Sequence, residues 1–230
     1  MRRPQSVTVA GLAVILTISV GCGSGNENGT KQESKTRVPD RLNSIEGATE
    51  DIIDIVPESR WDDITKDVRK IDNAWSSYKE QAVRDGAAAS LVARFSDSLA
   101  GLRVAADAEK GPETSQAAND VSAATVELFG LYKTARPTDI ARLDVLGRQI
   151  ILDVERGDLG AAGAQVKNVA SIWQGGLRQD VLAHQGGAVA DQTDAVLTAI
   201  DRAMVSADRD ALVIQTKAFL EVVDAMVRLY

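Results

Sequence analysis

The chain has 230 residues, of which 44% are hydrophobic and 26% are charged, so it fits one large or two small globular domains. Its formal net charge is −7, and an acidic protein gains nothing from phosphate backbones, which argues against nucleic-acid binding. Aromatic residues make up only 4% of the chain, so we expect a core of aliphatic and small side chains.

The first 22 residues carry an export signal. Arg2 and Arg3 precede an uncharged apolar run, residues 7–20, which is shorter than the about 20 residues that a membrane-spanning helix needs. The run ends in Val20-Gly21-Cys22, which resembles the lipobox of bacterial lipoproteins. The resemblance implies a signal peptide at 1–21 and a new N-terminus at Cys22. It also implies that fatty-acyl chains such as palmitate on this cysteine hold the protein at the extracytoplasmic face of a bacterial membrane.

The mature chain is expected to be more acidic than the precursor. Loss of the two arginines with the signal peptide changes the formal charge from −7 to −9, so anionic lipid would repel the folded body. Membrane attachment is therefore expected to come from the lipid. Cys22 is the only cysteine, which excludes an intrachain disulfide. Residues 22–38 are rich in Gly, Asn, Ser and charge, and we interpret them as the lipidated cysteine and a flexible tether.

From Pro39 onward, apolar residues recur at three- and four-residue spacing, and no strand-like alternation is sustained, so we predict an all-α fold. Ser59, with Asp62 three residues later, resembles a capping box at one helix start. Asp158 and Asp208 are expected to cap two later helices. The expected helices contain residues 45–55, 61–82, 91–106, 117–131, 143–154, 159–173, 189–203 and 212–229.

The body of the chain resembles itself at an offset of 98 positions. This offset places Trp75 on Trp173 and Pro39 on Pro137 without a gap, and it also places Leu131-Tyr132 on Leu229-Tyr230. We predict a tandem duplication of a four-helix unit, at 39–132 and 137–230. Two arrangements remain open, a helical bundle or a short stack of antiparallel helical hairpins. It also remains open whether the two repeats share one core.

Two pairs of residues exchange charge between the repeats. Glu50 corresponds to Arg148, and Arg103 corresponds to Asp201. If an approximate two-fold axis relates the repeats, equivalent helices meet there and these charges pair. Random drift on solvated surfaces is the alternative that we favour.

The candidate ligand site lies in the second long helix, where Gly175 and Gly176 follow Trp173. A glycine inside a helix costs about 1 kcal/mol relative to alanine, so these two need a reason. One explanation is the close approach of a neighbouring helix. The other is a small apolar recess lined by Trp173, and this recess is the only ligand site that we predict.

The sequence suggests no catalytic or metal centre. His184 is the only histidine, and no nucleophile and orienting acid can be assigned to it, so a position near a helix end is the simpler interpretation. Glu46, Glu50 and Asp54 share one helical face. Such oxygen ligands would suit a weak calcium or magnesium site, but a solvated acidic face is the alternative that we favour. We predict no cofactor and no metal.

The expected function follows from this address and architecture. The leading expectation is a non-catalytic binding or scaffolding module at the cell envelope, which engages a protein partner and no nucleic acid. The alternative is a solute- or metal-binding lipoprotein for uptake or sensing. An enzyme is not expected.

Overall fold

A computed structural model describes residues 37–230, and regular structure within this range is entirely helical, which confirms the all-α prediction. The predicted signal peptide, Cys22 and nearly all of the tether lie outside the described residues.

The helices form two successive groups. The first group consists of α1 (Asp40–Ile55), the 3₁₀ turn η1 (Val56–Glu58), α2 (Trp61–Arg84), α3 (Ala89–Asp107) and α4 (Gly111–Phe129). The second consists of α5 (Thr138–Glu155), α6 (Leu159–Ile172), the π-helical turn η2 (Trp173–Leu177), α7 (Arg178–Ala183), α8 (Gly187–Ser206) and α9 (Arg209–Val227). Because η2 continues directly from α6 into α7, these three elements together form one long helix that is interrupted at η2.

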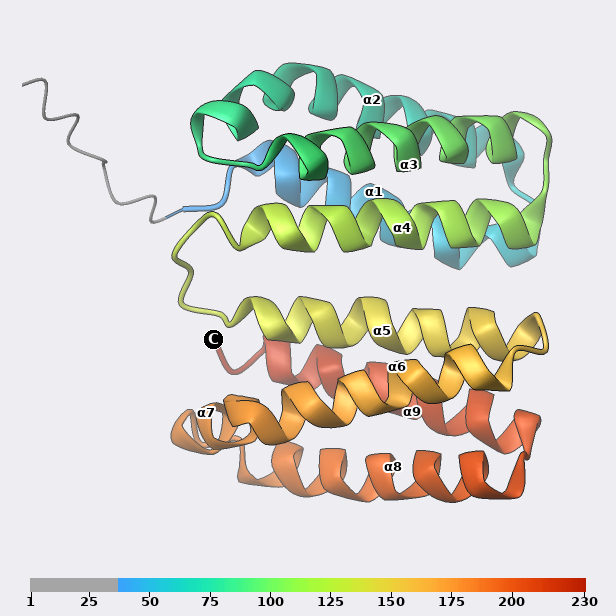
Figure 1. Ribbon diagram of the computed structural model, residues 1–230, viewed down its shortest axis with the longest axis vertical. Helices are drawn as coiled ribbons and strands as arrows, with labels where there is room; N and C mark the ends of the chain where they lie inside the picture. The colour runs from blue at the N-terminus through green and yellow to red at the C-terminus, as the bar shows by residue number, and fades with distance from the viewer. Residues whose placement is uncertain (1–36) are drawn as a thin grey trace, which may run out of the picture. The chain divides into compact units, whose positions relative to one another are not determined.

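Each group closes into a four-helix bundle. In the first, α1 packs against α2 and α4, and α3 packs against α2 and α4. In the second, α5 packs against α6 and α9, while α8 contacts α9, α6 and α7. The two bundles meet chiefly where α4 packs against α5 (Figure 1). The structure is thus a pair of joined bundles rather than a stack of separate hairpins.

The two bundles start their helices at equivalent positions. The first residues of α5, α6, α8 and α9 follow those of α1, α2, α3 and α4 by 98 positions each. The correspondence reaches hydrogen bonds: Trp75 donates from Nε1 to Ser96 at 3.2 Å, and Trp173 donates to Asp194 at 2.7 Å. Ser96 and Asp194 are also 98 positions apart. Descent from a duplicated ancestor stays a prediction, which this correspondence supports.

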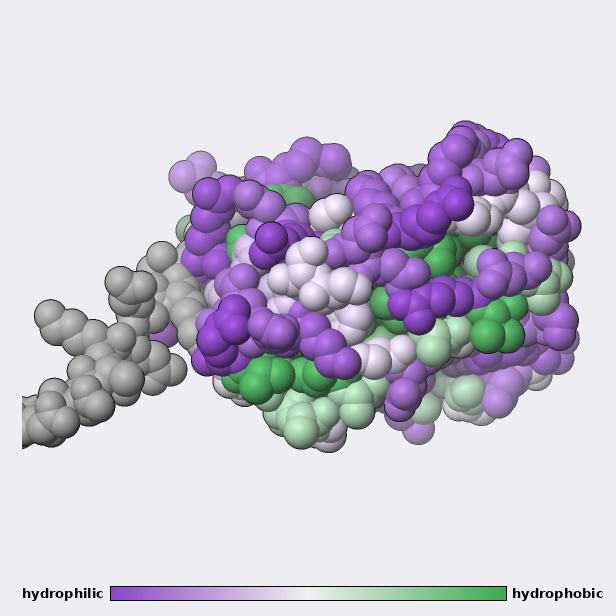
Figure 2. Space-filling model, turned by 90° about the horizontal axis from the view of Figure 1, so that it is seen from above, coloured by the Kyte–Doolittle hydropathy of each residue, from purple (hydrophilic) through white to green (hydrophobic). Residues whose placement is uncertain are grey.

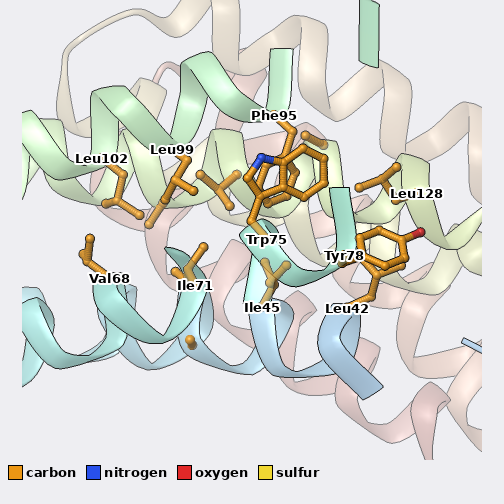
Figure 3. Packing of buried hydrophobic residues seen from close by; sticks show 14 of the residues in the cluster. Leu42, Ile45, Val68, Ile71, Trp75, Tyr78, Phe95, Leu99, Leu102 and Leu128 are labelled. Carbon is orange, nitrogen blue, oxygen red and sulfur yellow. The ribbon is translucent and has the colours of Figure 1, made fainter. Parts of the chain in front are cut away.

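The described residues contain two hydrophobic cores, one in each bundle. In the first, Trp75 stacks on Phe95 with 3.9 Å between ring centroids, and aliphatic side chains from all four helices surround the pair (Figure 3). Burial of one such aliphatic side chain is worth about 1.5–3 kcal/mol. Each bundle therefore has its own source of stability, and the contact between bundles does not have to supply a core.

The helix caps agree with the sequence in two places and differ in one. Asp158 accepts a hydrogen bond from the backbone N–H of Ala161, and Asp208 accepts one from Ala211, which confirms both caps. The predicted capping box at Ser59 is wrong. Ser59 ends η1 with φ 54° in the left-handed region, whereas an N-cap residue takes an extended backbone conformation. The residue before α2 is Arg60, and its side chain makes no capping hydrogen bond to the start of the helix.

The surface over α2 and α3 is mostly hydrophilic, with apolar residues in separate patches (Figure 2). Val104 on α3 is the large apolar residue most exposed in the first bundle, at 71%. Scattered exposed valines are ordinary on a soluble surface. A candidate site is therefore better sought in the hollows between the bundles.

Candidate binding site between the two bundles

Helices α1 and α5 face each other across the junction of the bundles. Arg148 on α5 donates from Nη2 to Oε1 of Glu50 on α1 at 2.9 Å, and these residues are 98 positions apart. The hypothesis that Glu50 pairs with Arg148 is confirmed, and random drift, the interpretation favoured from the sequence, is wrong for this pair. The predicted pairing of Arg103 with Asp201 is wrong, because α3 packs against α2, where Arg103 donates from Nε to Asp72 at 2.8 Å.

Arg148 is held by carboxylates of both bundles. Its Nη2 also pairs with Asp144, one turn earlier on α5. The side chains of Arg148 and Asp144 are only 13% and 19% exposed, whereas that of Glu50 is 42% exposed. Nη1 of Arg148 is buried without a partner among the described residues. This cation is therefore a fixed part of the junction and not a free surface charge.

An acidic cavity of about 170 Å³ lies on one side of Arg148. Its carboxylates come from three helices: Glu46 and Glu50 from α1, Asp144 from α5 and Asp224 from α9. Arg136 also lines it, so four carboxylates share the cations of two arginines. The favoured interpretation of Glu46 as part of a solvated acidic face is wrong, because its side chain is partly buried and faces α5.

The crowding of these carboxylates changes their titration. Burial, together with the neighbouring charges of Glu50 and Asp144, raises the pKa of Glu46 to about 7, although Arg136 and Arg148 oppose this change. Burial also raises the pKa of Asp144 to about 6, although Arg148 opposes this change. These two carboxyl groups therefore titrate near neutral pH, whereas ordinary surface carboxylates titrate well below it.

A second cavity, of about 370 Å³, lies beyond Arg148 and is here called the apolar cavity. Its aliphatic walls come from both bundles, and two of them, Ile53 on α1 and Ile151 on α5, are again 98 positions apart. Its remaining lining consists of Asp54, Pro57, Ser115, Arg148, Leu152, Glu155, Lys217 and Leu220. The size lies in the range typical of small-molecule sites.

The cavities exist because the two sides of the junction differ. On one side, α4 packs against α5 through partly buried amides: Asn119 donates to Gln149 at 3.0 Å, and Gln149 donates to Gln116 at 3.1 Å. On the equivalent side, α1 and α9 come close at few points, and both cavities lie along that opening. A strict two-fold relation would close both sides alike.

The predicted recess at Trp173, Gly175 and Gly176 lies elsewhere, in and around η2. Trp173 is 2% exposed and points into the second core. A Cβ on either glycine would meet nothing within 4 Å, so close approach of another helix does not explain them. Gly176 has φ 140°, which other residues rarely adopt, and this explains its identity. The recess itself stays a prediction.

His184 lies at the end of α7, as expected from the sequence. Its Nδ1 is 2.9 Å from the carbonyl oxygen of Asp180, and its ring contacts that of Tyr230 at 4.3 Å between centroids. The Tyr230 hydroxyl donates to the Asp180 carboxylate, and this contact and burial raise its pKa. These contacts hold the C-terminal residue against α7, which is a structural role.

Within residues 37–230, no three His, Cys, Asp or Glu side chains lie so that they could hold a metal ion. Over the same range, no helix combines the length and the apolar character that crossing a membrane requires.

The sequence named only part of the junction. It singled out Glu46, Glu50 and Arg148 but not Asp144 or Lys217. The 98-residue offset was the available signal, since it places Glu46 on Asp144. Lys217 and Leu220 come from α9, and only the packing of α9 beside α5 brings them to the cavity.

No protein-family model matches the chain, and no curated protein or solved structure is significantly similar to it.

Proposed function

We propose that this chain is a non-catalytic binding or scaffolding module of a bacterial cell envelope, held at the extracytoplasmic face by lipid on Cys22. The observation that supports binding is the open junction between the bundles. Each bundle has its own core, yet aliphatic and charged side chains of α1, α5 and α9 line two cavities between them. Such concave, partly apolar places are where proteins bind ligands and partners.

Lipid anchoring is tested with Cys22→Ser. The chain with Cys22 unchanged is expected to incorporate labelled palmitate and to sediment with membranes after a high-salt wash. The variant should lose the label and should not be processed to the mature form. Equal labelling of both proteins would refute lipidation at Cys22.

Partner binding is tested by placing a photo-crosslinking amino acid at Lys217, which lines the apolar cavity, in the native host. The matched control is Lys167, an exposed lysine on α6 that does not line either cavity. A specific crosslinked band at 217 that is missing at 167 supports a partner at the junction. Bands of equal strength at both positions, or no band at either, contradict it.

A second candidate function, solute binding, is favoured by the volume of the apolar cavity. Native mass spectrometry of the lipidated chain, purified in detergent from its own host, measures it directly. A retained mass beyond the lipidated polypeptide supports a resident small molecule. The mass of the lipidated polypeptide alone argues against a tightly held one and leaves the partner as the leading form of the proposal.

A further inference from the structure

Three of the four isoleucine and leucine residues that line the apolar cavity lie outside both hydrophobic clusters. Ile151, Leu152 and Leu220 belong to neither hydrophobic cluster of the described residues, although Leu152 is only 9% exposed. Ile53, on the opposite wall, packs against the first core. The cavity is therefore faced by aliphatic groups of both bundles without a side chain to fill it. An apolar ligand group would replace the missing contacts.

Positively and negatively charged side chains also line the apolar cavity. Lys217 comes from α9, Asp54 from α1 and Glu155 from α5, and none of the three forms an ion pair within the described part of the chain. Arg148 is different, because Glu50 and Asp144 already bind it. The charges available to a ligand are thus one ammonium and two carboxylates, together with Nη1 of Arg148, which has no partner among the described residues.

The volume limits the size of the occupant. A cavity of about 370 Å³ holds roughly a dozen times the about 30 Å³ that one water occupies in the liquid. This is the lower end of the range for small-molecule sites, and it suits a ligand of few heavy atoms better than a lipid chain or a folded segment.

We propose that the apolar cavity binds an aliphatic amino acid as its zwitterion. The aliphatic side chain lies between Ile53, Ile151 and Leu220, the carboxylate pairs with Lys217, and the ammonium group pairs with Asp54 or Glu155. A simple anion would leave two carboxylates facing a negative charge, and a simple amine would meet Lys217 and Arg148. A ligand with both charges pairs with Lys217 and with one of the two carboxylates at the same time, and each charge-assisted contact adds to its affinity.

This assignment rests on the solute-binding form of the proposed function and names its ligand class. The probe is L-leucine, titrated calorimetrically into the mature chain 22–230 carrying Cys22→Ser, which bears no lipid. Two analogues test the charges one at a time: 4-methylvalerate lacks the ammonium group, and isoamylamine lacks the carboxylate. Leucine is expected to bind at least about tenfold more tightly than either analogue, the range for loss of one charge-assisted contact.

Variants separate the roles of the rim and the walls. Lys217→Met should weaken leucine about tenfold and should not weaken isoamylamine, whose repulsion by Lys217 it removes, whereas Lys167→Met, on the surface of α6, should change neither. Ile151→Phe should block all three probes by filling the cavity, and its circular dichroism spectrum checks that it folds. If Ile151→Phe does not fold, Lys217→Met still tests the proposal.

The outcomes distinguish the ligand from the wider function. Equal affinity for leucine and 4-methylvalerate, or unchanged leucine binding in Lys217→Met, overturns the zwitterion assignment. Absence of leucine binding together with a retained mass in native spectrometry also overturns this ligand class, while solute binding as a function stands. Absence of both overturns the assignment and the solute-binding form together, and the crosslinking test of a protein partner is independent of either result.

Discussion

The acidic cavity makes a quantitative prediction about stability and pH. Glu46 has a pKa of about 7 in the folded chain, against an ordinary value of 4.5, chiefly because it is buried. A folded-state pKa above the unfolded value means that the folded chain holds an extra proton between about pH 4.5 and 7. The stabilising contribution of this proton is complete below pH 4.5 and is lost as pH rises through 7.

The size of the effect follows from the same values. The difference between 4.5 and about 7, at 1.36 kcal/mol for each pH unit, gives an upper limit of about 3 kcal/mol. The Glu46 side chain is only partly buried, so solvent screens part of this penalty. We therefore expect Glu46→Gln, which removes the charge with little change in shape, to stabilise the chain by about 1–3 kcal/mol at pH 8 and by little at pH 4.5.

The assay is urea denaturation of the Cys22→Ser chain and of its Glu46→Gln derivative across this pH range, followed by far-ultraviolet circular dichroism. Asp144, with a pKa of about 6, contributes a dependence of the same sign in both proteins. The control is Asp191→Asn, an exposed carboxylate on α8, which should leave the pH profile unchanged. Parallel profiles for Glu46→Gln and the parent would refute the burial argument.

Three further predictions concern the junction and the interrupted helix. A double-mutant cycle with Glu50→Gln and Arg148→Gln should give a coupling energy of about 0.5–1 kcal/mol in denaturation experiments. The coupling is this small because the Glu50 side chain is 42% exposed and solvent screens the pair. Zero coupling would mean that the ion pair between α1 and α5 contributes nothing to stability. Gly176→Ala should lower the unfolding free energy by about 1–3 kcal/mol because φ is 140°, whereas Gly175→Ala should be neutral or stabilising, and equal effects would exclude a backbone cause. Gly147→Ala should destabilise by about 1–3 kcal/mol, because a Cβ there would lie 2.6 Å from a leucine side chain of α9, and an unchanged melting temperature would contradict this close packing.

The second bundle shows how small residues let its helices differ from the first. In the first bundle, Thr49 on α1 forms a hydrogen bond of 2.7 Å with Ser122 on α4. The equivalent positions in the second bundle hold Gly147 and Leu220, which interlock between α5 and α9. The smaller residue on α5 makes room for the larger one on α9, so the two equivalent helix pairs pack in the same way with different side chains.

Several features were accessible from the sequence because they depend on neighbours along the chain. Apolar spacing of three and four residues, proline and glycine breaks, and capping aspartates are local, so the helices and the caps at Asp158 and Asp208 could be predicted. The capping box predicted at Ser59 is wrong because the 3₁₀ turn that contains Pro57 changes the backbone just before α2. The π-helical turn at Gly176 was missed because a glycine pair does not reveal its dihedral angles.

The charge exchange between Glu50 and Arg148 was accessible for a different reason. The offset of 98 residues gave both the equivalent positions and the geometry in which they would meet, and this contact formed. The same reasoning failed for Arg103, because an offset cannot say which equivalent helices lie at the junction and which lie at the periphery.

By itself, the sequence determined that the chain is helical, which stretches lie in its helices, and which residues of the two halves correspond. Only the tertiary structure decided that there are two cores, that α4 and α5 close one side of their junction, and that α1 and α9 leave the other side open. Helix formation follows from contacts three or four residues apart. The cavities, and the raised pKa values of Glu46 and Asp144, depend on distances between helices that are many tens of residues apart, which the shapes and volumes of the facing side chains fix only when they pack.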